Sequence, residues 1–338
     1  MTGKALLPVK TQKEAQIMKL KKLFVILLSA ALVFSLGACA KTAQEPDTKI
    51  RIAGLKGPTS MGLVKLMDNE KYEFTLAGSA DEVTPLLLKG ELDMAAVPAN
   101  LAAVLYNNSD GKIVTLAVNT LGVLSLLEKG DTVNGIEDLK GKTVYATGKG
   151  STPEYTLRHI LQSAGIDPDK DVTIEFKSEP AEVVALLQNE NGIAMLPQPY
   201  ATAALSQTEG LRLVLDISDA WDALVPESRL ITGVLAARKD FVEKYPEATA
   251  KFLAEYRDSA DWVNANNEEA SRLIEKYGIT KAAIAKKALP HCSIVFMDGA
   301  EMKQALSGYL AILSSQNPKA VGGKLPGEDF YYAAPSVK

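Results

Sequence analysis

The sequence predicts an α/β protein built from two units, each a mainly parallel sheet flanked by helices. Short apolar runs alternate with helical stretches along most of the chain, and most runs end in a loop rich in Gly, Ser, Thr, Asn or Pro that opens the next helix. The length of 338 residues suits about two domains of ~100–200 residues each. Strand–loop–helix repetition is typical of parallel sheets joined by right-handed crossovers.

Two blocks of the chain show this alternation. The first block has expected strands at residues 49–53, 72–77, 94–97 and 113–118. The second block has expected strands at residues 143–146, 172–176, 193–196, 211–215 and 231–236. From residue 239 to about 316 the pattern is mostly helical, with apolar positions at helical spacing between Phe252 and Val263.

Composition and charge exclude several classes of protein. Hydrophobic residues make up 47% of the chain and charged residues 23%, as in ordinary globular proteins. Residues 1–38 carry a net charge of +5, which leaves −9 on the remainder. An acidic chain without a basic stripe argues against nucleic acid as a partner, because nucleic-acid binding needs clustered Lys and Arg.

Few residues are suited to catalysis or metal binding. The two cysteines, Cys39 and Cys292, form no C-x-x-C pair, and the two histidines, His159 and His291, lie far apart in the sequence. We see no pairing of a nucleophile with a base. We therefore expect no metal, no cofactor and no catalytic residue.

The N-terminus has the pattern of a secretory signal. Lys19, Lys21 and Lys22 precede an uncharged apolar run at residues 23–36, which is followed by small residues. The run is shorter than the ~20 residues that a membrane-spanning helix needs. We expect residues 1–38 to be removed, with 1–17 upstream of a true start at Met18.

The segment Leu36-Gly37-Ala38-Cys39 resembles a bacterial lipobox. This resemblance implies that Cys39 is lipidated, that residues 39–48 form a linker, and that the protein is held on the outer face of the bacterial cell membrane. The polar composition of residues 41–48 agrees with a linker.

The loops after the expected strands are the predicted binding region, because ligands of open parallel sheets bind beyond the carboxyl ends of the strands. In the loop 148–154, Ser151 and Glu154 fit a capping box and Pro153 fits the first helical turn. Pro153 also replaces the third glycine of a dinucleotide fingerprint, so that motif is rejected. The predicted ligand-binding residues are Lys56, Gly57, Thr59, Ser60, Ser79, Asn100, Asn119, Gly150, Ser151, Thr152, Gln198, Tyr200 and Thr232.

The identity of the solute stays open between two classes. Three cations near these loops suit an organic anion such as a sulfonate or a carboxylate: Lys56, Lys149 and Arg229. Three aromatic residues suit stacking on a planar heterocycle instead: Tyr155, Tyr200 and Trp221.

Three stretches carry a resemblance to a known family. They are Lys49-Ile-Arg-Ile-Ala-Gly, Gly135-Ile-Glu-Asp-Leu-Lys-Gly-Lys-Thr-Val and Phe241-Val-Glu-Lys-Tyr-Pro-Glu. Together they resemble the two-lobed type II periplasmic-binding-protein fold of ABC-importer solute-binding proteins. The narrower likeness is to the branch that binds nitrate, sulfonates, taurine or thiamine-pyrimidine precursors, although the loop 57–61 is unlike that of a typical sulfonate binder.

The resemblance implies an arrangement and a function. Lobe 1 would comprise residues 49–120 and 235–320, lobe 2 would comprise 121–234, and 321–338 would form a C-terminal tail. The chain would cross between the lobes near 119–123 and 229–234. A monomer would close on a small solute and deliver it to ABC permease transmembrane subunits. An enzyme on the same fold, of the pyrimidine-precursor synthase or menaquinone-route dehydratase type, and a sensory lipoprotein remain alternatives.

Overall fold

The computed structural model describes residue 46 and residues 49–333. Cys39 and the expected signal segment lie outside the described residues, so the structure does not test them. Among the residues it describes, no helix is both long and apolar enough to cross a membrane.

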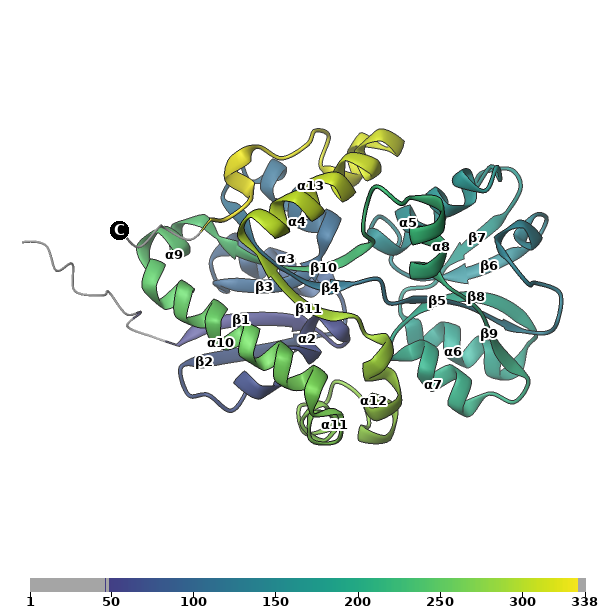
Figure 1. Cartoon of the computed structure of the whole chain (residues 1–338), viewed down its shortest axis with the longest axis horizontal. Coiled ribbons are helices and arrows are strands. Elements are labelled where there is room, and N and C mark those ends of the chain that lie inside the picture. Colours follow the sequence, from purple (N-terminus) through teal and green to yellow (C-terminus); the bar gives the residue numbers. More distant parts are fainter. Residues whose placement is uncertain (1–45, 47–48, 334–338) are drawn as a thin grey trace, which may run out of the picture. The chain divides into compact units, whose positions relative to one another are not determined.

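The first sheet has six strands in the order β11-β4-β10-β3-β1-β2 (Figure 1). Its strands are β1 (Ile50–Leu55), β2 (Tyr72–Ala77), β3 (Met94–Pro98), β4 (Ile113–Leu121), β10 (Ile231–Arg238) and β11 (Ile294–Asp298). β1 pairs in parallel with β2 and β3, whereas β10 lies antiparallel between β3 and β4, and β11 is antiparallel to β4.

The second sheet has five strands in the order β7-β6-β8-β5-β9. They are β5 (Leu124–Lys129), β6 (Thr143–Ala146), β7 (Thr173–Phe176), β8 (Gly192–Pro197) and β9 (Leu211–Asp216). β6 pairs in parallel with β7 and β8, and β5 is antiparallel to β8 and β9. The antiparallel strands β5 and β10 are those that enter each sheet directly from the other sheet, so they run against their neighbours.

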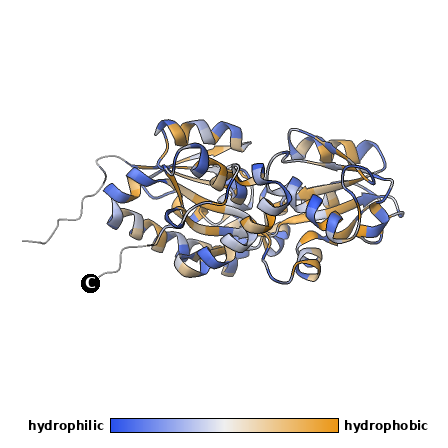
Figure 2. Cartoon of the chain, turned by 90° about the horizontal axis from the view of Figure 1, so that it is seen from above, coloured by the Kyte–Doolittle hydropathy of each residue, from blue (hydrophilic) through white to orange (hydrophobic). Residues whose placement is uncertain are grey.

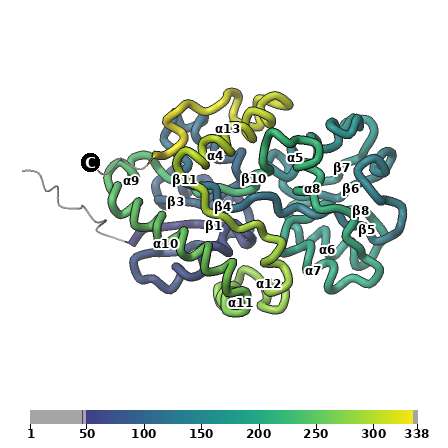
Figure 3. Tube along the Cα trace, in the orientation of Figure 1, coloured from purple at the N-terminus to yellow at the C-terminus, as the bar shows by residue number. Residues whose placement is uncertain are grey.

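The chain crosses between the sheets twice (Figure 3). The first crossing joins the end of β4 at Leu121 to the start of β5 at Leu124. The second runs from the end of α8 (Ile217–Leu224) to the start of β10. Because β10 belongs to the first sheet from Ile231 onward, the chain returns to lobe 1 earlier than the expected residue 235.

Helices cover both sheets, and the strands are largely hydrophobic, orange in Figure 2. Buried apolar side chains of the strands and helices form the core clusters. The largest fully buried side chains include Trp221, Tyr256 and Tyr309. The helices are α2 (Pro58–Met61), α3 (Ala80–Lys89), α4 (Ala99–Asn108), α5 (Thr152–Ser163), α6 (Pro180–Asn189), α7 (Tyr200–Gln207), α8 (Ile217–Leu224), α9 (Lys239–Lys244), α10 (Pro246–Ala265), α11 (Asn267–Lys276), α12 (Ala282–Ala288) and α13 (Gly299–Gln316).

The segment expected to be a C-terminal tail packs on the first sheet as far as it is described. Asn107 Nδ2 on α4 donates hydrogen bonds to the carbonyl oxygens of Val321 and Lys324, both at 2.7 Å. Phe330 is fully buried, and Tyr331 forms a bridge to β4. This segment therefore stabilises α4, whose first residues lie at the candidate site.

Candidate ligand site between the two sheets

The predicted loops of the two sheets meet. A methyl group on Gly57, after β1, would lie 3.9 Å from the carbonyl oxygen of Gln198, after β8. A methyl group on Gly78, after β2, would lie 3.8 Å from the Glu179 carboxylate, after β7. Loops from the carboxyl ends of strands in both sheets thus enclose one region between the lobes, as the rule for open sheets predicts.

A group of buried hydroxyls lies on the first-sheet side of this region. Thr59 is 8% exposed and Ser60 is fully buried, and both lie on α2, directly after β1. Thr59 Oγ1, Ser60 Oγ and Thr232 Oγ1 have no hydrogen-bond partner among the described residues. Because an unsatisfied buried polar group costs about 1–3 kcal/mol, such groups in a binding region point to a ligand that would satisfy them.

Asn119 and Gly233 hold Thr59 in place. Asn119 Nδ2 donates to the Thr59 carbonyl oxygen at 3.4 Å, and Asn119 Oδ1 accepts from Thr120 Oγ1 at 3.0 Å. A methyl group on Gly233 would lie 2.5 Å from Thr59 Cγ2 and 2.7 Å from Asn119 Oδ1. Gly233 is therefore required for this packing, a role that its place at the expected second crossing alone does not predict.

A second polar group joins the two lobes and has its hydrogen bonds satisfied. The fully buried Asn100, at the start of α4, donates through Nδ2 to the carbonyl oxygens of Ala320 at 3.0 Å and Gly150 at 3.4 Å. Its Oδ1 accepts from Thr152 Oγ1 at 3.2 Å. We predicted all of Asn100, Gly150 and Thr152 as ligand contacts, but the structure pairs them with one another across the lobes. For this reason we name Asn100, Gly150, Thr152 and Ala320 the Asn100 clasp.

Other predicted residues begin helices and are bonded locally. Ser79 forms a capping box with Glu82 at the start of α3. Ser151 Oγ donates to the Gly148 carbonyl oxygen at 2.8 Å, and Gln198 Oε1 accepts from Thr202 Oγ1 at 2.7 Å. These side chains hold the loops in shape. Ser151 is the N-cap residue of α5, but the expected capping box with Glu154 does not form, because Ser151 Oγ bonds the Gly148 carbonyl and Glu154 bonds the N–H of Gly150.

The two remaining predicted positions are less enclosed. Tyr200 is half-buried, and its pKa is raised by burial and by the nearby charge of Glu179. Lys56 is exposed. Both lie in loops that enter the region between the lobes.

Trp221, a candidate for stacking, is packed in the protein interior. It is fully buried, its Nε1 donates to the Ser228 carbonyl oxygen at 3.1 Å, and its ring lies between His159 and Tyr309 at 5.2 and 5.5 Å. Tyr309 belongs to α13, so this contact also joins the two lobes. Burial raises the Tyr309 pKa to about 12 and lowers the His159 pKa.

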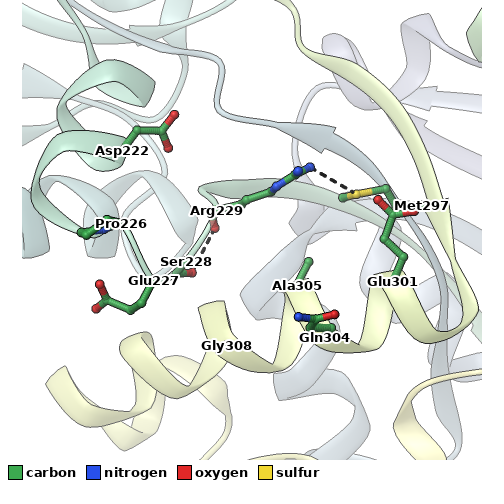
Figure 4. Close-up of a pocket in the computed structure, with 10 residues that line it drawn as sticks. All are labelled: Asp222, Pro226, Glu227, Ser228, Arg229, Met297, Glu301, Gln304, Ala305 and Gly308. Carbon is green, nitrogen blue, oxygen red and sulfur yellow. Dashed lines mark hydrogen bonds between the residues drawn. The ribbon is translucent and has the colours of Figure 1, made fainter.

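A separate pocket lies between the α8–β10 segment and α13 (Figure 4). Its volume is 590 Å³, and Arg229 extends across it so that its Nη1 lies 3.9 Å from Met297 Sδ. Asp222, Glu301 and Arg229 are exposed here. The pocket is lined by Asp222, Pro226, Glu227, Ser228, Arg229, Met297, Glu301, Gln304, Ala305 and Gly308.

The structure shows no cluster of potential metal ligands among the residues that it describes. Among residues 46 and 49–333, no group of three or more His, Cys, Asp or Glu side chains is placed to hold a metal ion. Cys292 is buried with its Sγ 3.7 Å from Met61 Sδ, and burial raises the pKa of its thiol to about 12.

Comparison with known proteins supports the fold. A crystal structure of an ABC transporter from Parabacteroides distasonis is 26% identical, with a TM-score of 0.72 over 86% of this chain and 100% of that chain. The aliphatic sulphonate-binding protein SsuA of Escherichia coli is 19% identical, with a TM-score of 0.66 over 82% and 96%. The nitrate-binding protein NrtA of Synechocystis is 16% identical, with a TM-score of 0.56 over 72% and 70%.

Sequence comparison defines the family. Proteins of Brucella abortus and Brucella suis, each named only as a binding protein, are 24% identical over 174 residues. This match covers 51% of the chain and 52% of each relative, so the chain spans about half the length of the curated relatives it matches. The model of the NMT1-like family matches residues 68–277.

The two lobes, the two crossings and these likenesses define the class: a type II periplasmic-binding-protein fold of the ABC-importer solute-binding kind. Within that class, the chain belongs to the NMT1-like family. The predicted fold class and family resemblance are thereby confirmed.

Proposed function

We propose that this protein captures a small polar organic solute between its two lobes and delivers it to the transmembrane subunits of an ABC importer. The observation that supports this most directly is the unpartnered, buried hydroxyls of Thr59 and Ser60 beside the crossing strand β10. Relatives named for sulphonate and nitrate binding support a small polar solute.

The region between the lobes is a better candidate than the pocket in Figure 4. The polar side chains of that pocket, such as Asp222 and Arg229, are exposed and already hydrated. Thr59 and Ser60 are withdrawn from water and have unused hydrogen-bonding capacity. A ligand gains more from satisfying buried groups than from replacing water at exposed ones.

In the proposed mechanism, lobe 1, which carries the first sheet, supplies Gly57, Thr59, Ser60 and Asn119, and lobe 2, which carries the second sheet, supplies Gln198 and Tyr200. Residues 122–123 and 225–230 would act as the hinge, because they are the short links between the two sheets. Closure would press the two sets of loops onto the solute. The exposed Lys56 and the helix-starting Ser79 and Ser151 would line its edge.

We propose a binding protein and not an enzyme. The solved neighbours named above are binding or transport proteins. The two histidines, the side chains most often used in proton transfer, lie apart: His159 packs against Trp221, and His291 is exposed.

We also propose that Cys39 anchors the protein to the outer face of the cell membrane. The support is the sequence pattern alone. Mass spectrometry of membrane-extracted protein should find a lipidated Cys39 at the N-terminus, and Cys39→Ser should release the protein into the soluble fraction. A wild-type protein that keeps residues 1–38, or that is equally soluble with either residue, contradicts the anchor.

The binding proposal is tested by a thermal-shift screen followed by isothermal titration with the hit. A ligand at ~100 times its dissociation constant adds about 2.7 kcal/mol of stability, which is readily measured. Thr59→Val should then weaken binding by about two- to tenfold, the value of one lost neutral hydrogen bond. Gln304→Ala, in the pocket of Figure 4, is the control and should leave affinity unchanged; the reverse pattern would move the site to that pocket.

A further inference from the structure

Buried charge is distributed in a way that bears on the solute. Within residues 46 and 49–333, no lysine, arginine or histidine belongs to the buried set. Three acidic side chains do, and each is paired with an arginine: Asp93 with Arg51, Glu128 with Arg212, and Glu154 with Arg158. No buried cation is therefore free to neutralise an anionic solute.

Helix N-termini are the other common way to hold an anion, because their free N–H groups carry partial positive charge. Here two of the helices that start between the lobes, α3 and α5, supply their own acceptors, whereas α2, which carries Thr59 and Ser60, has no acidic residue in its first turn. Glu82 Oε1 accepts from the backbone N–H groups of Gly78 and Ser79, both at 3.0 Å. Glu154 Oε2 accepts from the N–H of Gly150 at 2.7 Å. An anion approaching either helix would meet a carboxylate in the position it needs.

Two carboxylates from opposite lobes converge near Gly78. A methyl group there would lie 3.3 Å from Glu82 Oε1 and 3.8 Å from Glu179 Oε1. Both carboxylates are exposed, so this end of the region between the lobes attracts hydrogen-bond donors and repels negative charge through interactions that solvent screens.

The lysines nearby do not compensate for this. Lys56 and Lys149 are both exposed. At 4 Å through water, attraction between unit charges is worth about fivefold in affinity, and salt reduces it further. That is small beside the cost of removing an anion from water without a buried partner.

The groups that remain are neutral. Thr59, Ser60 and Thr232 offer hydroxyls that both donate and accept. We infer that the solute is an uncharged, hydrogen-bond-donating molecule and not an organic anion, an inference that rests on the proposed function. Its donors would face Glu82 and Glu179, and its remaining polar groups would meet the hydroxyls.

The inference is tested by titrating the full chain with size-matched pairs: organic carboxylates against their carboxamides, and sulfonates against their sulfonamides, at pH 7. We expect the neutral member of any binding pair to bind at least about tenfold more tightly than the anion. Anions that bind equally or better overturn the inference and leave the proposed function standing. No binding by either set counts against both.

A double variant tests whether Glu82 and Glu179 cause the preference for neutral ligands. In Glu82→Gln/Glu179→Gln the capping geometry of α3 is kept, because Gln also serves in a capping box. The preference for the neutral member should fall several-fold in this variant, and it should not change in Glu190→Gln, an exposed residue at the end of α6. An unchanged preference in the double variant overturns the role of the two carboxylates.

Discussion

Two groups of buried polar residues lie between the lobes, and they differ in one respect. In the Asn100 clasp, side-chain and backbone groups of both lobes satisfy one another. In the group of Thr59, Ser60 and Thr232, three buried hydroxyl oxygens have no partner among the described residues. Thr59 and Ser60 follow β1, as Asn100 follows β3 and Thr152 follows β6, whereas Thr232 lies within β10 and Ala320 follows α13.

This difference suggests different roles: the Asn100 clasp holds the lobes together, and the unpartnered hydroxyls hold the solute. A satisfied buried group stabilises the arrangement in which it is satisfied, whereas an unsatisfied one destabilises the protein until a ligand completes it. Residue type and position in a loop predict both groups equally. Only the hydrogen-bond partners seen in the structure distinguish the Asn100 clasp from the group of Thr59, Ser60 and Thr232.

The largest expected effect on solute affinity comes from Gly233→Ala. The added methyl would lie 2.5 Å from Thr59 Cγ2 and 2.7 Å from Asn119 Oδ1, so Thr59 must move. Overpacking of this kind costs about 1–3 kcal/mol, and we expect solute affinity to fall by about ten- to a hundredfold. Gly308→Ala is the matched control, because nothing lies within 4 Å of its added methyl. Titration calorimetry on both variants decides; equal affinities would show that Thr59 is not at the site.

The largest expected effect on stability comes from Asn100→Ala, which removes three hydrogen bonds and leaves their partners on the buried residues Thr152 and Ala320 unsatisfied. We expect the free energy of unfolding to fall by about 2–4 kcal/mol and the lobes to open, seen as a larger radius of gyration by small-angle scattering. Asn107→Ala is the control, since Asn107 holds Val321 and Lys324 within one lobe. It should lose stability without expanding. Equal expansion in both variants would contradict a role for the clasp in closure.

A smaller effect concerns pH. Burial lowers the His159 pKa below its ordinary value of 6.5, so the unfolded chain binds the proton more readily than the folded one. This contribution to stability is present above pH 6.5 and is lost as the pH falls through the folded-state value. His159→Phe keeps the packing on Trp221 and should show a smaller drop in unfolding temperature between pH 7.5 and 5.5 than the wild type. A drop of the same size contradicts the assignment.

Much of the fold could be predicted from the sequence, because local patterns specify it. The strands 72–77 and 143–146 agree with β2 and β6, and the others differ from the structure by a few residues at their ends. β5 and β11 were missed. The β5 sequence LSLLEK is rich in leucine, a good helix former, and β11 lies in a stretch of helical periodicity; both are strands because they pair with β8, β9 and β4.

The candidate site was predictable only in outline. The rule for strand ends predicts loops of the two lobes side by side, and the structure places Gly57 near Gln198 and Asn100 near Gly150. It did not predict that Asn100 and Thr152 bond each other, or that Gly233 makes room for Thr59, because these contacts join residues far apart in the chain. Trp221 was misjudged for the same reason: its burial comes from Tyr309 on a helix of the other lobe.

The most direct test of the account is one matched pair of substitutions, Thr59→Val and Thr152→Val, compared by denaturant unfolding without solute. Thr59→Val removes an unpartnered hydroxyl and should raise the free energy of unfolding by about 1 kcal/mol, even though it weakens binding. Thr152→Val removes the donor to Asn100 Oδ1 and should lower it by about 1–2 kcal/mol. Opposite signs support a solute site at Thr59 beside a structural clasp at Asn100. A loss of stability of equal size in both variants would contradict that distinction.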